Sequence, residues 1–361
     1  MQRVNIKDLV PKENVESVFF VKYIAVAEAR NGNKYLNVIL SDSTGDLESR
    51  SWNSAEEIAS KIEKGDFAKV KGKTNIYQGR KQFILQSISK IDKSEINMDD
   101  FVLKADRKAD EMFDELFSLV NALDDVYIRD LLVNILSDTE IQRRLKKWQA
   151  GKTIHHAYQG GLLEHILSCA NLAKTLSPIY KVNLNYVMAG AVLHDICKVY
   201  ELTDDLNVEY TEEGKLVGHL VKALEVVDRF SYRMKQFPHQ TKMHLKHILL
   251  SHHGEYAYGS PKIPQTSEAM LVHMIDLMDS KMHTFETVKR TDNNTGHWTG
   301  FVKHLDRIVY KDELPFHNEY LEETPSEEKH QAVETKKKPT GKTKEKASSG
   351  AMADALKGFK V

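Results

Sequence analysis

The stretch AVLHDICK, residues 191 to 198, sets a histidine and an aspartate side by side at the end of an apolar run of helical character. Burying either side chain without a partner would be costly, because an ionisable group loses its hydration in an apolar interior. Either the stretch is exposed, or something compensates for the burial of His194 and Asp195. The rest of the sequence decides between these two interpretations.

The composition is that of a soluble globular protein with two or three domains. The chain has 361 residues, 41% of them hydrophobic and 29% charged, which is too long for one small core. No apolar run is long enough to cross a bilayer, and the start MQRVNIKDLVPKENV has no signal-peptide core. Two cysteines, Cys169 and Cys197, cannot form a disulfide framework, so we expect a cytoplasmic protein and no membrane partner.

The charge and histidine content narrow the function classes. A net charge of −1 excludes a protein wholly dedicated to coating nucleic acid, so any such contact should come from local patches. The sequence also contains 16 histidines, many of them between residues 155 and 304. This concentration indicates metal or acid–base chemistry in that region.

Residues 17 to 91 have the alternation and the turn residues of a small barrel. The pattern predicts strands at 17–29, 34–42, 47–52, 67–73 and 81–91. It also predicts an Asn-Gly hairpin turn at 31–33 and a short helix at 54–64 that Ser54 caps. Three strands, a helix and two strands is the order of an OB-fold, a barrel that binds single-stranded nucleic acid.

This barrel carries aromatic and basic side chains that could bind a single strand by stacking and by charge. The candidates are Tyr23, Tyr35, Trp52, Lys69, Lys71, Tyr77, Arg80 and Phe83. Any one of the aromatic residues could instead fill the barrel core. Both interpretations stay open, and only the set as a whole favours nucleic-acid binding.

From Lys104 to about Tyr310 the apolar residues recur at the i, i+3, i+4 spacing of helices. The stripes predict helices at 108–125, 126–138, 140–150, 162–176, 186–200, 219–235, 241–253 and 267–285. From Glu322 onward the composition cannot form a core. The sequence thus predicts a multidomain α+β protein, with a barrel at 1–95, a helical linker region at 96–150, an all-α domain at 151–315 on which the linker packs, and a Lys-rich disordered tail at 322–361.

Histidines and aspartates recur at the boundaries of the apolar stripes. In chain order they are His165, His194, Asp195, His219, His252, His253 and Asp276. Imidazole nitrogens with carboxylate oxygens suit divalent ions such as Mn, Fe, Co, Ni or Zn. Adjacent helical residues diverge by about 100°, so His194 and Asp195 can share an ion only if it lies close against the helix.

Further ligands must then come from other helices, and His165 and Asp276 can supply them. Any one of these histidines could be a satisfied core or surface residue, as we expect for His244 and His247. For the whole set, that interpretation requires several costly burials by coincidence. The set therefore predicts a metal centre, and a structural zinc site is disfavoured because no thiolate pattern accompanies it.

The order H…HD…D in an all-helical region resembles the HD-domain metal-dependent phosphohydrolases over residues 150 to 310. The motifs IHHAYQGGLLEH, LHDICK, HHGEYAYGSPKIPQTSEAM and HMIDLMDSKM, behind an OB-like region, are similar to those of the YhaM-type 3′→5′ exoribonucleases. The likeness spans nearly the whole ordered chain. One departure is Cys197, where the family usually has glycine, and we expect the site to tolerate it because cysteine on a helix costs little strain.

The resemblance implies hydrolysis of single-stranded RNA, or of single-stranded DNA, to mononucleotides. One ion would bind His165, His194, Asp195 and Asp276, and a second would bind His219, His252 and His253. We expect Mn2+, one or two ions per chain, which would lower the pKa of a bound water toward about 7 and polarise a phosphoryl oxygen.

Other residues near these motifs have expected supporting roles. Lys198, one turn after Asp195, would act with it in catalysis by neutralising charge on the phosphate, and Asp279 would accept a hydrogen bond from a ligand histidine. Tyr256, Tyr258 and Lys262 could grip a terminal nucleotide.

Two other functions stay open. The chain could be an HD phosphohydrolase of small nucleotides, or a non-catalytic RNA-binding adaptor whose helical domain has lost its chemistry. The presence of His165, His194, Asp195 and Asp276 argues against the adaptor. The cleavage direction follows from the resemblance alone, and the sequence leaves homo-oligomerisation open.

Overall fold

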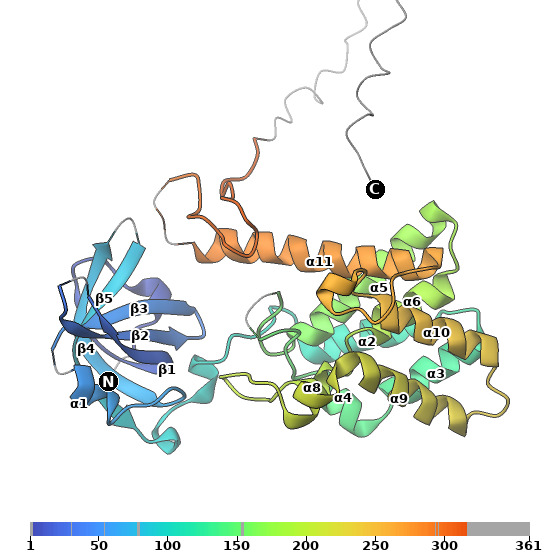
Figure 1. The fold of residues 1–361 in the computed structure, drawn as a ribbon, viewed down its shortest axis with the longest axis horizontal. Helices are drawn as coiled ribbons and strands as arrows, with labels where there is room; N and C mark the ends of the chain where they lie inside the picture. Colours follow the sequence, from blue (N-terminus) through green and yellow to red (C-terminus); the bar gives the residue numbers. More distant parts are fainter. Residues whose placement is uncertain are drawn as a thin grey trace, which may run out of the picture. The chain divides into compact units, whose positions relative to one another are not determined.

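The computed structural model describes residues 3–315, except 30, 54, 78–79, 153–154, 293, 295 and the side chain of Arg80. Five strands close into a barrel in the order β1-β2-β3-β5-β4 (Figure 1). They are β1 (Asn14–Glu28), β2 (Lys34–Asp42), β3 (Gly45–Ser51), β4 (Phe67–Tyr77) and β5 (Arg80–Ile91). The predicted OB-like barrel is confirmed, with α1 (Ala55–Ala59) between β3 and β4.

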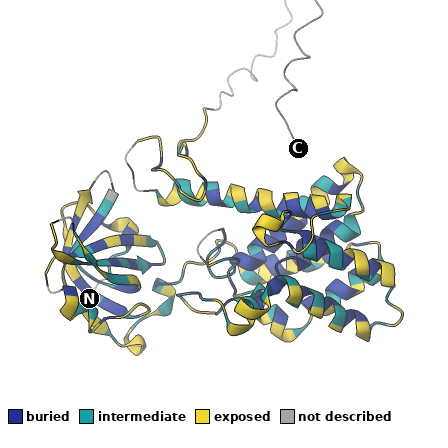
Figure 2. Cartoon of the chain, viewed as in Figure 1, coloured by how far each residue is buried: buried dark blue, intermediate teal, exposed yellow. Residues whose placement is uncertain are grey.

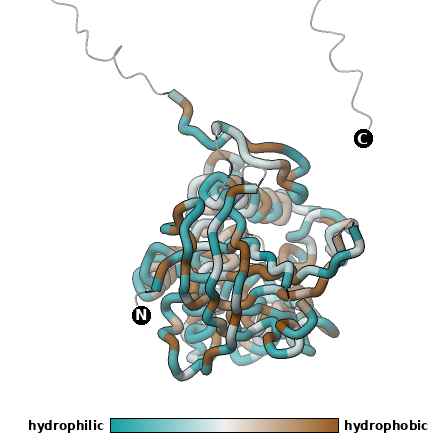
Figure 3. Tube along the Cα trace, turned by 90° about the vertical axis from the view of Figure 1, so that its left-hand side faces the viewer, coloured by the Kyte–Doolittle hydropathy of each residue, from teal (hydrophilic) through white to brown (hydrophobic). Residues whose placement is uncertain are grey.

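The barrel interior is filled by one face of each strand. Along β2, for example, Leu36, Val38 and Leu40 are buried while the residues between them are partly exposed. The polar and apolar segments of the strands appear as short alternating stretches in Figure 3. One detail differs from the prediction, because α1 is shorter than the expected helix 54–64. The expected Ser54 cap lies outside the described residues.

Phe83 corrects one of the predicted nucleic-acid contacts. Its side chain is fully buried on β5, where it packs in the barrel core with Leu36 and Val70. Stacking on a base requires an exposed ring face, so Phe83 stabilises the barrel and does not contact nucleic acid.

The rest of the described chain is helical up to Thr291. Three 3-10 turns, η1 (Ile6–Asp8), η2 (Lys93–Glu95) and η3 (Met98–Asp100), precede the helices. The helices are α2 (Ala109–Asn121), α3 (Val126–Leu136), α4 (Thr139–Leu145), α5 (Gly161–Tyr180), α6 (Leu184–Leu193), α7 (Lys198–Glu201), α8 (Glu212–Leu216), α9 (Gly218–Arg233), α10 (His239–Ser251) and α11 (Ser267–Thr291), with a fourth 3-10 turn, η4 (Tyr256–Tyr258), before α11.

One apolar core joins these helices. Helix α6 is buried continuously from residue 187 to 193 and packs against α3, α5, α10 and α11. Figure 2 shows exposed residues on the outer sides of the helices and buried residues where the helices meet. Helices α2, α3 and α4 contribute side chains to this same core.

Two predicted helices are corrected by the structure. The expected helix 186–200 breaks into α6 and α7, because residues 194–197 form a turn between them. The predicted helical character up to Tyr310 is also wrong. Among the described residues after Thr291, short bridges pair Trp298 with Tyr310 and Val302 with Arg307, and there is no helix.

The predicted tail at 322–361 lies outside the described residues. In the part of the chain that is described, every helix is too short or too polar to cross a membrane.

Candidate metal centre

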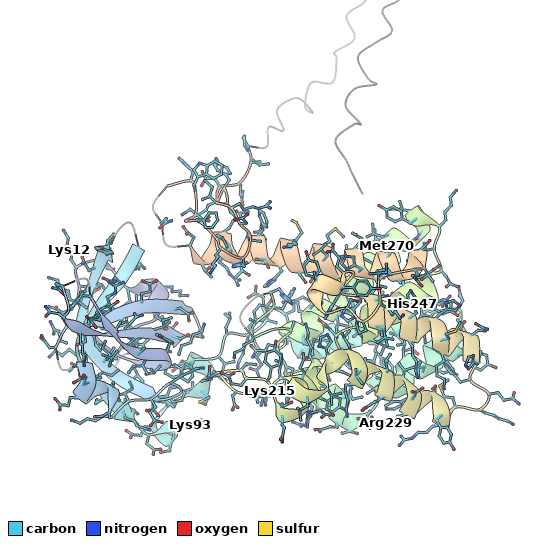
Figure 4. All side chains as sticks on the ribbon, viewed as in Figure 1. Lys12, Lys93, Lys215, Arg229, His247 and Met270 are labelled. Atoms are coloured by element: carbon cyan, nitrogen blue, oxygen red, sulfur yellow. The ribbon has the colours of Figure 1, made fainter. Side chains whose placement is uncertain are left out.

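Five segments of the helical domain bring the predicted ligands together. Helix α5 carries His165, the α6–α7 turn carries His194 and Asp195, and α9 carries His219. His252 and His253 follow α10 directly, and α11 carries Asp276. Five of the seven side chains are buried, while His253 and Asp276 are half-buried. His244 is exposed, and His247, labelled in Figure 4, is half-buried and accepts a hydrogen bond from the Gln265 backbone at 3.0 Å.

Four ligand atoms form a first group. His165 Nε2 lies 3.0 Å from His194 Nε2, 3.6 Å from Asp195 Oδ2 and 3.4 Å from Asp276 Oδ1. His194 Nε2 lies 3.6 Å from Asp195 Oδ2 and 3.8 Å from Asp276 Oδ1. Ligands that share one ion at about 2.1 Å are separated by about 3 to 3.5 Å. The spacing of this group fits one divalent ion.

The second group consists of His219, His252 and His253, whose ligand nitrogens lie within 4.8 Å of one another. His219 Nε2, His252 Nε2 and His253 Nδ1 are buried and have no hydrogen-bond partner among the described residues. Buried polar atoms are nearly always partnered in folded proteins. Three such nitrogens gathered together therefore fit a cation.

Asp195 faces both groups. Its Oδ2 atom belongs to the first group, while its Oδ1 atom lies 3.5 Å from His219 Nε2 and 3.8 Å from His252 Nε2. One carboxylate between two sets of imidazoles is suited to bridging two ions. The residues present thus fit a pair of divalent metals.

Hydrogen bonds orient four of these histidines with Nδ1 turned away from the centre. Each Nδ1 contacts an oxygen atom, which leaves Nε2 free to bind a metal. The pairs are His194 with the Ala191 carbonyl at 3.0 Å, His252 with the Leu249 carbonyl at 2.8 Å, His165 with Asp279 Oδ2 at 2.7 Å and His219 with Glu201 Oε1 at 2.9 Å. The contact expected of Asp279 is therefore present.

The charges of the centre favour bound cations. Burial tends to raise the pKa of Asp195, but Lys198 and the surrounding histidines hold that pKa well below its usual range, so the carboxylate is ionised. Burial lowers the pKa of His252 well below 6.5, and the neighbouring His194 adds to this effect. The pKa of His253 is lowered by burial and by His219. Neutral imidazoles and ionised carboxylates are the forms that bind metals.

His165 behaves differently from these histidines. Burial tends to lower its pKa, but Cys169, Asp276 and Asp279 together raise the pKa well above 6.5. Cys169 Sγ lies 3.8 Å from His165 Nδ1, and burial raises the pKa of this thiol to about 11.

Lys198 and Cys197 flank the Asp195 side chain. Lys198 Nζ lies 2.6 Å from Asp195 Oδ2, so its charge reaches the first group of ligands. Cys197 is buried with φ of −80° and ψ of 0°, angles that any residue adopts. The glycine usual in the resembling family is thus not required by the backbone here.

The predicted nucleic-acid contacts of the barrel fall on separate strands. Tyr35 on β2 packs against Trp52 with ring centroids 4.9 Å apart and the ring planes tilted by 33°, and Arg50, which sequence reasoning missed, lies over Tyr35 at 5.4 Å. Tyr23 and Tyr77 are also exposed. The lysines lie on β4, which pairs with β1 and β5 rather than with β2 or β3.

On β4, Lys71 is exposed, while Lys69 pairs with Glu16 at 2.7 Å. The lysines of β4 are therefore not on a strand paired directly with the one that carries Tyr35. The side chain of Arg80 lies outside the described residues.

The loop after the His252–His253 pair carries the remaining candidates. Tyr256 and Tyr258 in η4 are exposed, as is Lys262. All three are accessible to a ligand.

Sequence reasoning missed several residues around the centre. Glu201, which holds His219, has no motif of its own and is separated from His219 by another helix. His156, Tyr158, Glu164 and His283 form a further cluster beside Asp279. The motif IHHAYQGGLLEH contains His156, whereas only the concentration of histidines could have drawn attention to His283.

Comparisons with known proteins match both parts of the chain. Residues 162–281 match the family described as HD domain, and residues 18–91 match the family described as OB-fold nucleic acid binding domain. HD domains are metal-dependent phosphohydrolases, so the class that fold and site define is a metal-dependent phosphohydrolase combined with an OB-fold nucleic-acid-binding domain.

Among solved structures, the chain is similar to the second OB-fold domain of replication protein A from Methanococcus maripaludis, with 22% identity, 26% of this chain and 97% of that chain covered, and a TM-score of 0.22. It is also similar to the single-stranded DNA binding protein from Thermus aquaticus, with 18% identity, 22% and 40% covered, and a TM-score of 0.20. A mitochondrial single-stranded DNA binding protein from S. cerevisiae has 12% identity, 23% and 97% covered, and a TM-score of 0.20.

Proposed function

We propose that the protein is a metal-dependent 3′→5′ exoribonuclease that hydrolyses single-stranded RNA to mononucleotides. The observation that carries this proposal is Asp195, which lies between the imidazoles of His165 and His194 and a second group of imidazoles whose buried nitrogens have no hydrogen-bond partner among the described residues. The same chain matches an OB-fold nucleic acid binding domain. The preference for RNA and the 3′→5′ direction rest on the resemblance of the sequence motifs.

His165, His194, Asp195 and Asp276 would hold one divalent ion, and His219, His252 and His253 would hold a second, with Mn2+ as the proposed metal. Such ions activate a water nucleophile and neutralise charge on the phosphoryl group. Glu201 and Asp279 would fix the ring orientation of two ligand histidines. Lys198 would add a positive charge beside Asp195, where charge develops on the phosphate.

The barrel would hold the strand while the helical domain removes its terminal nucleotide. Tyr35 on β2 and Trp52, which directly follows β3, offer exposed or half-exposed rings, and stacking contributes about 1–3 kcal/mol per base with little sequence preference. Tyr256, Tyr258 and Lys262 would contact the terminal nucleotide. We therefore propose an exonuclease with little base preference, acting in the cytoplasm.

The test compares an RNA oligonucleotide labelled at its 5′ end with the same RNA labelled at its 3′ end, in the presence of Mn2+. The proposal predicts a ladder of shortening products from the 5′-labelled RNA and immediate release of a labelled mononucleotide from the 3′-labelled RNA. Turnover of free nucleotides without any cleavage of RNA would instead identify a small-nucleotide phosphohydrolase.

The matched variants separate catalysis from binding. His194→Ala combined with Asp195→Ala should abolish turnover and leave the affinity for RNA largely unchanged, whereas the exposed control His244→Ala should behave as wild type. RNA binding with no cleavage by the wild-type protein would favour a non-catalytic adaptor.

A further inference from the structure

Two consecutive residues before α5 hold an unusual backbone conformation. His155 and His156 have φ of 40° and 48°, the left-handed region that residues other than glycine rarely adopt. Such residues persist only where surrounding structure determines them, and they concentrate at functional sites. The contacts of this turn therefore show what it is built to position.

The backbone of His156 is anchored on both sides. Its N–H donates to His283 Nδ1 on α11 at 3.1 Å, and its carbonyl accepts from the Ala150 N–H at 3.1 Å. Gly161, the first residue of α5, packs directly against this carbonyl, where a Cβ atom would lie 2.1 Å from the oxygen. Helix α5 can begin here only because residue 161 has no side chain.

The side chain of His156 is also fixed. It is buried, its Nε2 lies 3.0 Å from Asp279 Oδ2, and its Nδ1 lies 3.0 Å from Glu164 Oε2. Its ring stacks on His283 with centroids 3.7 Å apart. Because Asp279 also binds His165, these contacts tie the turn to a residue of the metal centre.

His156, Tyr158, Glu164 and His283 have the residue types of a further metal site, but their arrangement argues against one. The Tyr158 hydroxyl lies 2.9 Å from His156 Nδ1 and 3.0 Å from His283 Nε2, and it also hydrogen-bonds Glu164. The hydroxyl thus occupies the place among these atoms that an ion would need. We call these four residues and Asp279 the His156 cluster, and its geometry is that of a support for the turn.

The other residue of the turn, His155, extends toward the metal centre. Its ring centroid lies 6.1 Å from that of His165. Burial lowers the pKa of His155, with a further contribution from the charge of Lys198. No hydrogen bond joins this ring to another described residue. An imidazole ring carries at least one N–H donor in either protonation state, so this ring can donate a hydrogen bond to a ligand.

We propose that His155 is a catalytic residue that donates a hydrogen bond from its imidazole to an oxygen of the phosphate held at the metal centre, and that the His156 cluster positions it. The proposal rests on the proposed phosphodiester hydrolysis and deepens it. A fixed donor aimed at developing phosphate charge stabilises the transition state more than the ground state. No residue of the motif order H…HD…D would supply such a donor, because those residues would hold the ions.

The experiment uses the full-length, Mn2+-loaded chain and two substrates, an RNA oligonucleotide and bis(p-nitrophenyl) phosphate, a generic phosphodiester. His155→Ala should lower kcat on both substrates by about 10²- to 10³-fold, the usual effect of removing one such donor. KM and the metal content should change far less. His155→Gln, which keeps an N–H donor, should recover at least part of kcat, and the exposed control His304→Ala should match wild type.

A His155→Ala variant with kcat within about twofold of wild type on both substrates would overturn the proposal. So would loss of metal or of the folded state in this variant without any recovery by His155→Gln, because the role would then be structural. Wild-type protein that cleaves the generic phosphodiester but not RNA would refute the exoribonuclease assignment. The effect of His155→Ala could then still be measured on the generic phosphodiester. Wild-type protein inactive on both substrates would overturn both proposals.

Discussion

Asp279 allows the support of a metal ligand to be tested without touching the ligand. Its Oδ2 atom lies 2.7 Å from His165 Nδ1 and 3.0 Å from His156 Nε2, and its Oδ1 atom accepts a hydrogen bond from Ser168. In Asp279→Asn the amide oxygen can keep the contacts to both histidines, while the amide nitrogen faces a serine hydroxyl that can rotate to accept. The variant therefore removes the negative charge and little else.

The loss of that charge makes His165 a poorer metal ligand. Removing such a partner lowers metal affinity about 10- to 100-fold, which corresponds to about 1.4 to 2.7 kcal/mol of binding free energy. Calorimetric titration of the metal-free protein with Mn2+ measures this, with thermal unfolding as a check on the fold. Asp130→Asn, an exposed change of the same kind on α3, serves as the control.

Asp279→Asn protein that is folded and binds Mn2+ as tightly as wild type would refute the reasoning. It would mean that His165 is not a ligand, or that its orientation does not depend on the carboxylate.

Three further predictions concern pH, the barrel surface and the barrel core. The raised pKa of His165 stabilises the metal-free protein below pH 6.5, and this stability is lost as pH rises through the raised pKa. Urea unfolding should show that decline at alkaline pH without metal and not with saturating Mn2+, and a flat metal-free profile would contradict it. Trp52→Ala should weaken RNA binding by about 1–3 kcal/mol without lowering the unfolding temperature, as fluorescence anisotropy and calorimetry can show. Phe83→Ala should instead destabilise the barrel by about 3–5 kcal/mol, and weakened RNA binding by a fully stable Phe83→Ala protein would restore the role that its burial excludes.

The barrel was predictable because its signals are local. Alternation within each strand and the turn residues around Gly32 and Gly45 set the strand order, and both glycines have positive φ. For β5 the sequence did not show which side chains point into the barrel. The adjacent residues Gln82 and Phe83 are both buried, as is Leu85, although neighbouring side chains of a strand point to opposite faces. Alternation in sequence cannot separate core aromatics from exposed ones when both faces of a strand are partly covered.

The helical domain shows the corresponding limit. Residues 186–200 contain no proline, and their apolar residues keep a helical spacing throughout. The sequence therefore predicts one continuous helix, although the structure has a turn at 194–197. That turn matters for the site, because it lets Asp195 face both ligand groups. In a continuous helix, by contrast, the side chains of His194 and Asp195 would point about 100° apart.

Residue type and order were sufficient to name the candidate ligands, since few other arrangements tolerate so many buried histidines and aspartates. They were not sufficient to find Glu201 or His283. The contacts of these residues depend on how distant segments meet, as between His156 and His283, which are 127 positions apart. Periodicity carries no information about such contacts.

The most direct test of the metal centre is anomalous X-ray diffraction from crystals of the full-length protein soaked in Mn2+. The account predicts one peak bounded by His165, His194, Asp195 and Asp276, and a second beside His219, His252 and His253, with Asp195 between them. A map with no manganese peak at these side chains, from protein that degrades RNA in the same Mn2+ solution, would contradict it.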